Sequence, residues 1–445
     1  MGRVFLFFVC NLHFLFCIAP IDFKVYDMQG AQSGHNVLIM SGIQGDEPGA
    51  YNATNLFLQY YTIKKGSVRV IPVLSPHSMY YNSRGIYGDL NRKFATLSKR
   101  DPEFGVIQKI KEQILKAEIQ AVFHMHDGSG FYREQYINET FNPKRWGNCS
   151  IIDQDSINVE PFGNLKEIVE QIVAHTNTGL LKSFHKYHIH NTHTAIKDKQ
   201  MQKSLTYFAI TNGKPAFAHE ASKTLPLRER VYYHLLGIEG FLQAVGVEFE
   251  RNFDLTPKTI ASLINDKNLT LTIDSSITIP LFHLKSPINF FPIPLSAKGD
   301  VQNLALESKS YILGLSPEGD FKADSMVFLK YGNRTMARIK PLYLEFDKSL
   351  EHIDIQVDGK RQEVKIGSIL KVKDNFYLHN KDGYRANVIG FIKPNDIAKK
   401  PQEFDVLVQK KAMLKKFALD INAKLYRVEF YKGNAFSGMI LVEFE

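Results

Sequence analysis

The stretch "HNVLIMSGIQGDEPGA", residues 35–50, carries the features that decide the fold. It begins with a short apolar run, which is typical of a buried strand in a largely parallel sheet. A glycine-containing loop follows, and a helix is expected after the loop. Gln44 and Glu47 lie three residues apart in this loop. A strand, a loop with polar groups and a helix together predict the ligand-binding edge of an α/β sheet.

The same alternation of strands and helices continues through the first half of the chain. Three later segments share the short, apolar character of the first strand: "SVRVIPVLSP" (67–76), "EIQAVFHMHDG" (118–128) and "KPAFAHEAS" (214–222). Apolar residues at helical spacing predict three amphipathic helices between and after them, at 102–117, 163–179 and 227–245. Residues 20–248 therefore predict one α/β domain, a mixed sheet flanked by helices.

After about residue 249 the helical pattern stops. Short strand-like runs, separated by Asn, Asp, Gly and Pro, fill the rest of the chain. We expect two small all-β domains, at 249–335 and 336–445. A β-hairpin is expected to turn at Asp358-Gly359. The last domain is a candidate for an immunoglobulin-like sandwich.

Residues 1–19, "MGRVFLFFVCNLHFLFCIA", have a charged start, an apolar middle and a small-residue end. This pattern predicts an export signal peptide, with an uncleaved membrane anchor as the alternative. Two of the three cysteines lie in this segment, so the mature chain keeps only Cys149 and can form no internal disulfide. A large exported protein without disulfides suggests a bacterial periplasm.

The net charge is +9, and Lys and Arg are spread along the chain rather than grouped. A nucleic-acid partner is not expected, because no basic cluster with recognition elements is present. An acidic small molecule or an acidic polymer fits the charge better.

Several polar side chains follow the predicted strands at their carboxyl ends. Gln44 and Glu47 follow the first strand, His126 lies in "HMHDG", and Glu220 lies in "AFAHEAS". In open α/β sheets, groups at these strand ends meet in one crevice. The turn-rich loop "NSRGIYGDLNRKF", residues 82–94, adds three further polar residues, namely Arg84, Asn91 and Arg92.

Together these side chains provide the parts of a metallohydrolase that holds an anion. A catalytic zinc keeps about three protein ligands and one open position. A carboxylate that is not a ligand can carry the proton from water to the leaving group. Arginine side chains can hold a carboxylate or stabilise a developing oxyanion.

The ordered set of motifs resembles the zinc carboxypeptidases of the M14 family. "QGDEPGA" stands where that family has His-x-x-Glu, and "HMHDG" stands at its third ligand. "GDLNRKF" matches its Asp-Leu-Asn-Arg motif, and "AFAHEAS" lies at its general-base glutamate. With export, two β domains and Gln44 in place of histidine, the chain looks most similar to the peptidoglycan DL-carboxypeptidases that determine the shape of curved and helical Gram-negative bacteria.

The resemblance implies a role for each position. Gln44, Glu47 and His126 would hold one Zn²⁺ ion, and Glu220 would be the general base. Asn91 and Arg92 would bind the substrate carboxylate, while Arg84 would polarise the scissile carbonyl. The implied reaction removes meso-diaminopimelate from a muramyl tripeptide. Because the Gln44 amide is a weaker donor than imidazole, we expect a lower zinc affinity and not the loss of the site.

Other interpretations remain open at this point. Glu47 could merely favour the start of a helix, and His126 or Glu220 could be ordinary packed residues. His124, where the family has Asp, is expected beside the ligands or in the core. The segment "HKYHIHNTH", 185–193, suggests a surface strand rather than a second metal site. The alternative functions are a metal-poor murein-binding scaffold and an amidoacylase of the desuccinylase type. Cell-wall or shape-complex proteins are candidate partners of the β domains.

Overall fold

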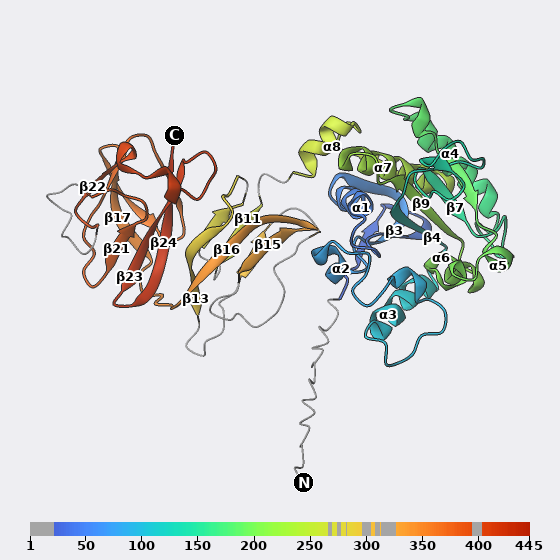
Figure 1. The fold of residues 1–445 in the computed structure, drawn as a ribbon, viewed down its shortest axis with the longest axis horizontal. Coiled ribbons are helices and arrows are strands. Elements are labelled where there is room, and N and C mark those ends of the chain that lie inside the picture. Colours follow the sequence, from blue (N-terminus) through green and yellow to red (C-terminus); the bar gives the residue numbers. More distant parts are fainter. Residues whose placement is uncertain are drawn as a thin grey trace, which may run out of the picture.

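The fold consists of a large α/β domain followed by two smaller β domains (Figure 1). The computed structural model describes residues 22–265, 269–273, 277–281, 283–295, 304–307, 312, 326–393 and 403–445. The predicted signal peptide, residues 1–19, lies outside these residues. Among the described residues, no helix is both long and apolar enough to cross a membrane.

A mixed eight-stranded sheet forms the centre of the first domain. Its strand order is β1-β3-β2-β4-β9-β7-β8, with β10 also paired to β3. Neighbours are parallel from β3 through β2 and β4 to β9, whereas β1, β10 and β7 join antiparallel. The strands are β1 Tyr26–Gln29, β2 Gln32–Met40, β3 Tyr61–Ile71, β4 Ala121–Gly128, β7 Cys149–Ile152, β8 His188–Asn191, β9 Ala216–Ser222 and β10 Glu248–Arg251. The parallel centre is what the apolar strand pattern predicted, and the mixed sheet is what the resemblance to the M14 family implied.

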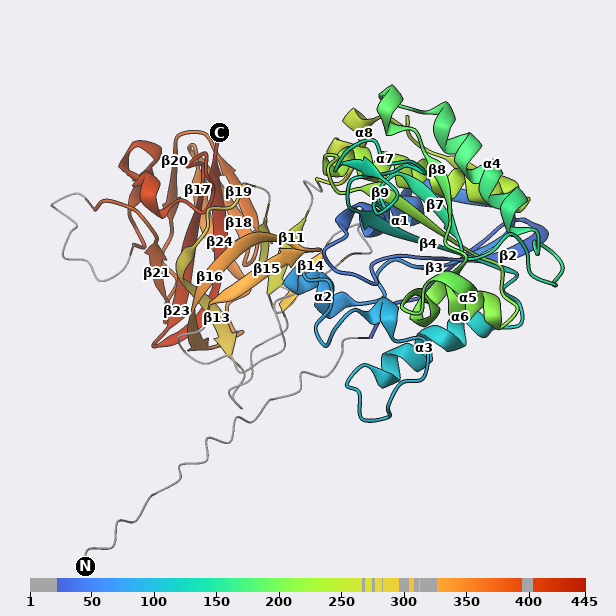
Figure 2. The same cartoon turned by 45° about the vertical axis from the view of Figure 1, so that its right-hand side comes forward.

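Helices cover both faces of this sheet (Figures 1 and 2). Helix α7 packs against α1 and α4 on one face, and α3 and α6 lie together on the other. The helices are α1 Pro48–Tyr60, α2 Pro76–Tyr81, α3 Phe104–Leu115, α4 Leu165–Thr178, α5 Thr194–Lys197, α6 Leu205–Thr211, α7 Leu227–Ala244 and α8 Pro257–Leu263, and the shorter elements are η1 Leu90–Arg92, η2 Ser183–His185, η3 Met201–Lys203, β5 Phe131–Tyr132 and β6 Phe141–Asn142. The three amphipathic helices expected from the sequence are therefore confirmed.

The first domain extends beyond residue 248, where the sequence placed its end. Strand β10 pairs with β3 of the central sheet, and α8 packs against α7. Ile260 and Ile264 are buried in the same core as the sheet. The domain therefore ends at about residue 265. The second boundary, placed after residue 335, falls inside β16 (Arg334–Glu345), which pairs with two strands of the middle domain and belongs to it.

The two remaining domains contain only strands and 3-10 turns among the described residues. In the middle domain β11 Thr270–Ile273, β12 Ile277–Pro280 and β14 Leu304–Glu307 form one sheet, and β13 Ile288–Leu295, β15 Val327–Tyr331 and β16 form another. The last domain contains β17 His352–Val357, β18 Lys360–Lys365, β20 Asn375–Leu378 and β22 Leu407–Gln409 in one sheet, β19 Ile369–Val372, β21 Arg385–Val388, β23 Leu425–Lys432 and β24 Ala435–Phe444 in a second, and the turns η4 Lys410–Ala412 and η5 Lys415–Phe417.

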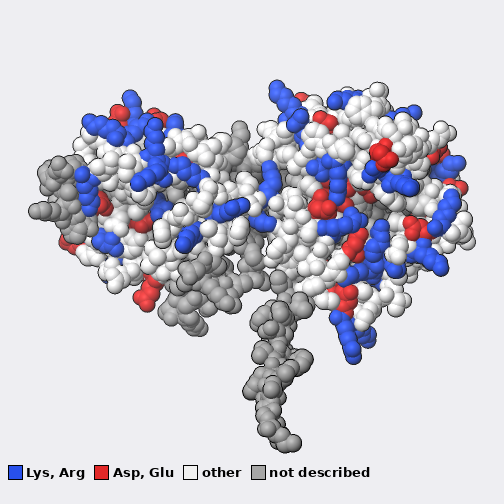
Figure 3. Space-filling view, in the orientation of Figure 1, with Lys and Arg blue, Asp and Glu red and all other residues white. Residues whose placement is uncertain are grey.

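The last domain is a sandwich, since apolar side chains from both of its four-stranded sheets share one core. Its predicted hairpin is confirmed: β17 and β18 join through Asp358 and Gly359, which both have positive φ angles. Asp-Gly favours such a turn because both residues tolerate the left-handed region. The immunoglobulin-like connectivity stays a prediction. Basic side chains occur on both the α/β and the β halves of the face in Figure 3.

Candidate active site

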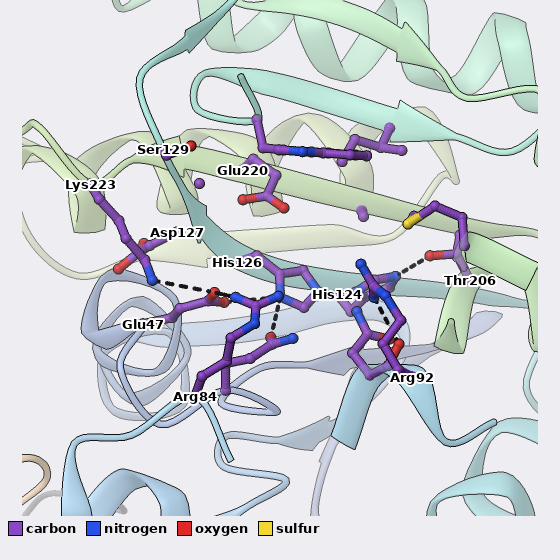
Figure 4. A pocket seen from close by; sticks show the side chains of 17 residues that line it. Glu47, Arg84, Arg92, His124, His126, Asp127, Ser129, Thr206, Glu220 and Lys223 are labelled. Atoms are coloured by element: carbon purple, nitrogen blue, oxygen red, sulfur yellow. Dashed lines mark hydrogen bonds and ion pairs between the residues drawn. The ribbon is translucent and has the colours of Figure 1, made fainter. Parts of the chain in front are cut away.

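The predicted ligands come from one loop and one strand at the carboxyl edge of the sheet (Figure 4). Gln44 and Glu47 lie between β2 and α1, and Glu47 is the residue that precedes the first turn of α1. His126 lies on β4, directly opposite Glu220 on the parallel strand β9. Paired residues on neighbouring strands point to the same face. The topology thus brings a loop of the first strand and two buried strands to one place.

Three donor atoms meet at the bottom of the pocket. His126 Nδ1 lies 2.8 Å from Gln44 Oε1 and 3.0 Å from Glu47 Oε2. All three side chains are buried. Two oxygen atoms and one imidazole nitrogen, turned toward one another, match the ligand number and donor types of a catalytic zinc site. In the described chain no group of three His, Cys, Asp or Glu side chains is arranged to hold a metal, and in this cluster the third donor is an amide.

Asp89 orients the amide of Gln44. The Gln44 Nε2 group donates to Asp89 Oδ1 at 2.9 Å, so Gln44 Oε1 is left facing His126. Asp89 also accepts from Arg84 Nε at 3.0 Å and from the Asn91 backbone N–H at 3.0 Å. We did not predict this residue as part of the site, although it begins the Asp-Leu-Asn-Arg segment. Its carboxylate sets which atom of the amide a metal would meet.

His124 supports the ligand His126 from the far side. The distance from His124 Nδ1 to His126 Nε2 is 2.8 Å. The other nitrogen, His124 Nε2, lies 2.8 Å from Thr206 Oγ1. Burial lowers the pKa of His124 well below its usual value, so the ring is neutral at neutral pH. The structure thus places His124 beside the predicted ligands, and its contact with Nε2 leaves Nδ1 of His126 facing Gln44 and Glu47.

Glu220 is buried opposite these donors and keeps one oxygen without a partner. No hydrogen bond reaches its Oε2 atom. Burial raises the pKa of this carboxyl to about 8, with His126 acting in the opposite direction. Gly128 lies so close that a methyl carbon placed there would be 2.7 Å from Glu220 Oε2. A buried carboxyl with a raised pKa and a free oxygen fits a proton carrier.

Arg84, Asn91 and Arg92 line the same pocket as the ligands and Glu220. Arg84 is half exposed and pairs with Asp89 and with Glu47 Oε1, at 3.3 Å from the latter. Arg92 donates to the Asn91 backbone carbonyl at 2.9 Å. The side-chain oxygen of Asn91 accepts from the Leu205 N–H at the start of α6. The side-chain oxygen of Asn91 therefore joins η1 to the start of α6. Arg84 and Arg92 contribute positive charge to the pocket.

Two further charged groups hold the ligand loop in place, and sequence analysis missed both. Asp127 accepts hydrogen bonds from Gly49 N–H at 2.8 Å, from Arg230 at 2.6 Å and from His234 at 2.9 Å. It thus ties the first turn of α1 to α7. Lys223 forms an ion pair with Asp46 at 2.8 Å. Asp127 stands in the quoted "HMHDG" segment, but the partners of Asp127 and of Lys223 cannot be read from the sequence, so the tertiary structure reveals their roles.

The histidine-rich segment 185–193 is packed among aromatic rings. His190 stacks on Tyr132 with ring centres 4.1 Å apart and also contacts Trp146. His185 is buried and stacks on Phe131. These rings serve packing, as expected for a strand beside the cleft. Cys149 is buried as a free thiol, which agrees with a structural role.

Three family models match consecutive parts of the chain. Residues 1–265 match the catalytic domain of a carboxypeptidase controlling helical cell shape. Residues 266–345 match the beta-barrel domain of carboxypeptidase M99, and residues 346–445 match a C-terminal domain of metallo-carboxypeptidase. The chain belongs to this carboxypeptidase family. The description of the C-terminal model names a metallo-carboxypeptidase, so membership of this family implies a metal ion.

Solved structures of a Helicobacter pylori protein are similar to this M99 chain over almost its whole length. The apo form of the cell shape determinant protein Csd4 is 48% identical, with a TM-score of 0.84, covering 95% of this chain and all of the other. The tripeptide-bound form of Csd4 is 47% identical, with the same coverage and TM-score. A third structure, described as the mDAP-bound form of Csd4, a D,L-carboxypeptidase, is 48% identical with a TM-score of 0.83 and covers 94% of this chain and 100% of the other. A search of curated proteins found no match.

Proposed function

We propose that this chain is an exported zinc carboxypeptidase that removes meso-diaminopimelate from the muramyl tripeptide of peptidoglycan and thereby influences cell shape. The observation that carries the proposal is the meeting of three donor atoms on His126, Gln44 and Glu47 beside a buried Glu220 with a free oxygen. The tripeptide-bound and mDAP-bound structures of Csd4 support the choice of substrate.

Gln44, Glu47 and His126 are the residues that would hold the zinc ion. One nitrogen and two oxygen donors suit Zn²⁺, and with a single carboxylate the protein ligands carry one negative charge. Bound zinc supplies Lewis acidity, which makes water a stronger acid and polarises the scissile carbonyl.

The chain's own side chains perform the remaining steps. Glu220 takes the proton of the attacking water on its free oxygen and later donates it to the leaving amine. Arg84, half exposed at the rim, stabilises the oxyanion that develops on the scissile carbonyl. Arg92 binds the free carboxylate of the terminal residue, since a guanidinium and a carboxylate can share two hydrogen bonds. These contacts favour a substrate with a free carboxyl end.

Incubation of the purified protein with muramyl tri-, tetra- and pentapeptides tests this function. We expect meso-diaminopimelate to be released from the tripeptide alone, and a chelator to stop the release. Binding of murein without release of any amino acid would instead favour a metal-poor scaffold. Release of an acyl group from an amino acid would favour an amidoacylase.

Export to the periplasm forms part of the proposal. The charged and apolar segment 1–19 supports it, together with the absence of a possible disulfide partner for Cys149 after cleavage. We expect mature protein in the periplasmic fraction with its N-terminus near residue 20. Recovery of the uncleaved chain in the membrane fraction would favour an anchor. The β domains are then free to contact cell-wall or shape-complex proteins.

A further inference from the structure

Among the described residues, the middle domain contacts the catalytic domain around the tight turn between β15 and β16, including Arg334 at the start of β16, and through Ile312. In this turn Lys330 Nζ donates to the backbone carbonyl of Tyr80. Asn333 Nδ2 donates to Asn82 Oδ1 at 2.9 Å. Both acceptors lie at the C-terminal end of the short helix α2. The turn therefore holds the point at which α2 passes into the loop that carries Arg84.

An apolar contact beside these hydrogen bonds excludes water from the junction. Tyr51, Val73 and Met79 of the catalytic domain form a buried cluster with Ile312 of the middle domain. Gly332, at φ +58°, lies at the tip of the turn, where an added methyl carbon would be 3.5 Å from both Tyr51 and Ile312. Glycine adopts this left-handed conformation without strain. The turn can therefore pack closely against the cluster.

Helix α2 leads from this contact directly to the active site. Asn82 ends the helix in the left-handed conformation, and Arg84 follows two residues later. The Ser83 carbonyl accepts a hydrogen bond from Gly45 N–H at 2.9 Å, next to the ligand Gln44. A methyl carbon on Gly45 would lie 1.9 Å from the carbonyl carbon of Ser78, so α2 and the ligand loop are in close contact.

We propose that the middle β domain is a positioning element of the active site: its β15–β16 turn fixes the end of α2, and α2 fixes Arg84. The need for such support follows from the exposure of Arg84, whose side chain is 50% accessible. Within its own loop only Asp89 restrains it by an ion pair, and the other partner is Glu47. Catalytic groups on loops act well only when surrounding structure holds them to within fractions of an ångström.

The double variant Lys330→Met/Asn333→Ala tests the proposal in the full-length protein. Hydrogen exchange of residues 76–92 should become roughly three- to tenfold faster, because the contacts that hold α2 are lost. Turnover of the tripeptide should fall by a similar factor of about three to ten in kcat, with little change in KM, because Arg84 acts on the developing oxyanion. The kinetic expectation rests on the proposed function, whereas the exchange measurement does not.

Lys330→Arg is the conservative variant of the wild-type protein. It should keep the wild-type exchange rate and kcat, since arginine is also a cationic donor for the Tyr80 carbonyl. Lys360→Met is the matched control, because Lys360 is an exposed lysine at the β17–β18 turn of the last domain. Unchanged exchange of 76–92 in the double variant, or an equal increase in Lys360→Met, would overturn the proposal. Faster exchange with an unchanged kcat would show that the turn holds α2 but that this support does not matter for turnover, which would overturn the catalytic part of the proposal. If wild type itself releases no amino acid, the proposed function fails, and the exchange result still decides the positioning role.

Discussion

Gln44 is proposed to present an uncharged oxygen to the metal, in place of the imidazole nitrogen that the resemblance to the M14 family would imply. Zinc binds imidazole more strongly than an amide oxygen. Gln44→His should therefore raise zinc affinity and resistance to chelators without adding charge at neutral pH. Gln44→Ala should lower both, because one of three donors is lost. Zinc titration against a competing chelator measures the affinities. Equal affinities in wild type and both variants would show that Gln44 does not bind the metal.

Glu220 is proposed to move a proton and not to bind zinc. Glu220→Ala should therefore lower kcat by about 10²–10⁴-fold while zinc stays bound. Metal content by atomic absorption, measured on the same sample as the tripeptide assay, separates the two effects. A variant that loses its zinc along with its activity would contradict the assignment.

Arg92 is proposed to recognise the terminal carboxylate of the substrate. Arg92→Ala should weaken binding of the tripeptide with a free terminal carboxylate much more than binding of its terminal amide. The reason is that loss of one partner of a buried charge pair costs about 2–5 kcal/mol. Ratios of kcat/KM for the acid and the amide provide the measurement. The same fractional loss for both substrates would mean that Arg92 does not read the carboxylate.

Glu47 gives the metal site a pH dependence. Burial raises the pKa of its carboxyl to about 8, with Lys223 as the main opposing influence. Below this pH the carboxyl of the metal-free protein holds a proton that zinc must displace. Zinc affinity should rise by up to about tenfold per pH unit between pH 6 and 8 and level off above. Chelator competition at pH 6, 7 and 8 checks this, and Glu220→Gln removes the second buried carboxyl as a control. A pH-independent affinity would contradict it.

At the level of elements, the segment before β7 and the Glu220 side chain leave no room at Gly128, the last residue of β4. A methyl carbon there would lie 2.5 Å from the Trp146 carbonyl carbon and 2.7 Å from Glu220 Oε2. Gly128→Ala should destabilise the protein by about 1–3 kcal/mol and displace the general base. Gly105→Ala is the matched control, because Gly105 lies in α3 with open space around it. The control should be neutral or stabilising by about 0.5–1 kcal/mol. Thermal unfolding of both variants provides the test.

The elements that sequence analysis predicted well are those with a strong local pattern. The helix at 227–245 repeats apolar residues at helical spacing, and α7 spans Leu227–Ala244. The motifs at Gln44, His126 and Glu220 were found because each follows an apolar strand. Asp89 and Asp127 were missed because their roles depend on which groups the tertiary structure brings to them. Both carboxylates stand within quoted motifs, but the sequence does not show which groups each of them will bind.

At the scale of the whole molecule, the catalytic core includes a helix beyond its predicted end. Ile260 of α8 is fully buried in that core. Ile260→Ala should destabilise the catalytic domain by about 2–5 kcal/mol. Calorimetry should show that this variant lowers the midpoint temperature of one unfolding transition. Added zinc should raise the midpoint of that same transition, since the substitution and the metal both act on one domain. Leu378→Ala, in the sandwich core, should leave the zinc-sensitive transition unchanged. A shift of the zinc-insensitive transition by Ile260→Ala would contradict the assignment of α8.

The domain boundaries could not be read from the sequence, because they depend on long-range strand pairing. Strand β10 resembles the short β-rich runs that follow it, yet it pairs with β3. Strand β16 crosses the second predicted boundary because its pairing with β15 reaches Ile339 and its pairing with β13 continues to Glu345. Composition changes gradually at both places, so only the hydrogen-bond partners of each strand decide where a domain ends.

The register of β4 against β9 has a consequence for how this enzyme can change over time. His126 and Glu220 are neighbours across a hydrogen-bonded ladder, so the spacing between strands fixes their separation. Arg84 and Arg92, by contrast, stand between α2 and α3, on the segment from which Asp89 and Ser83 also hold the loop of Gln44. New stem-peptide preferences are therefore expected from exchange of single side chains on that segment, and not from changes in its length. The strand register keeps His126 and Glu220 aligned while the rim side chains are exchanged one at a time.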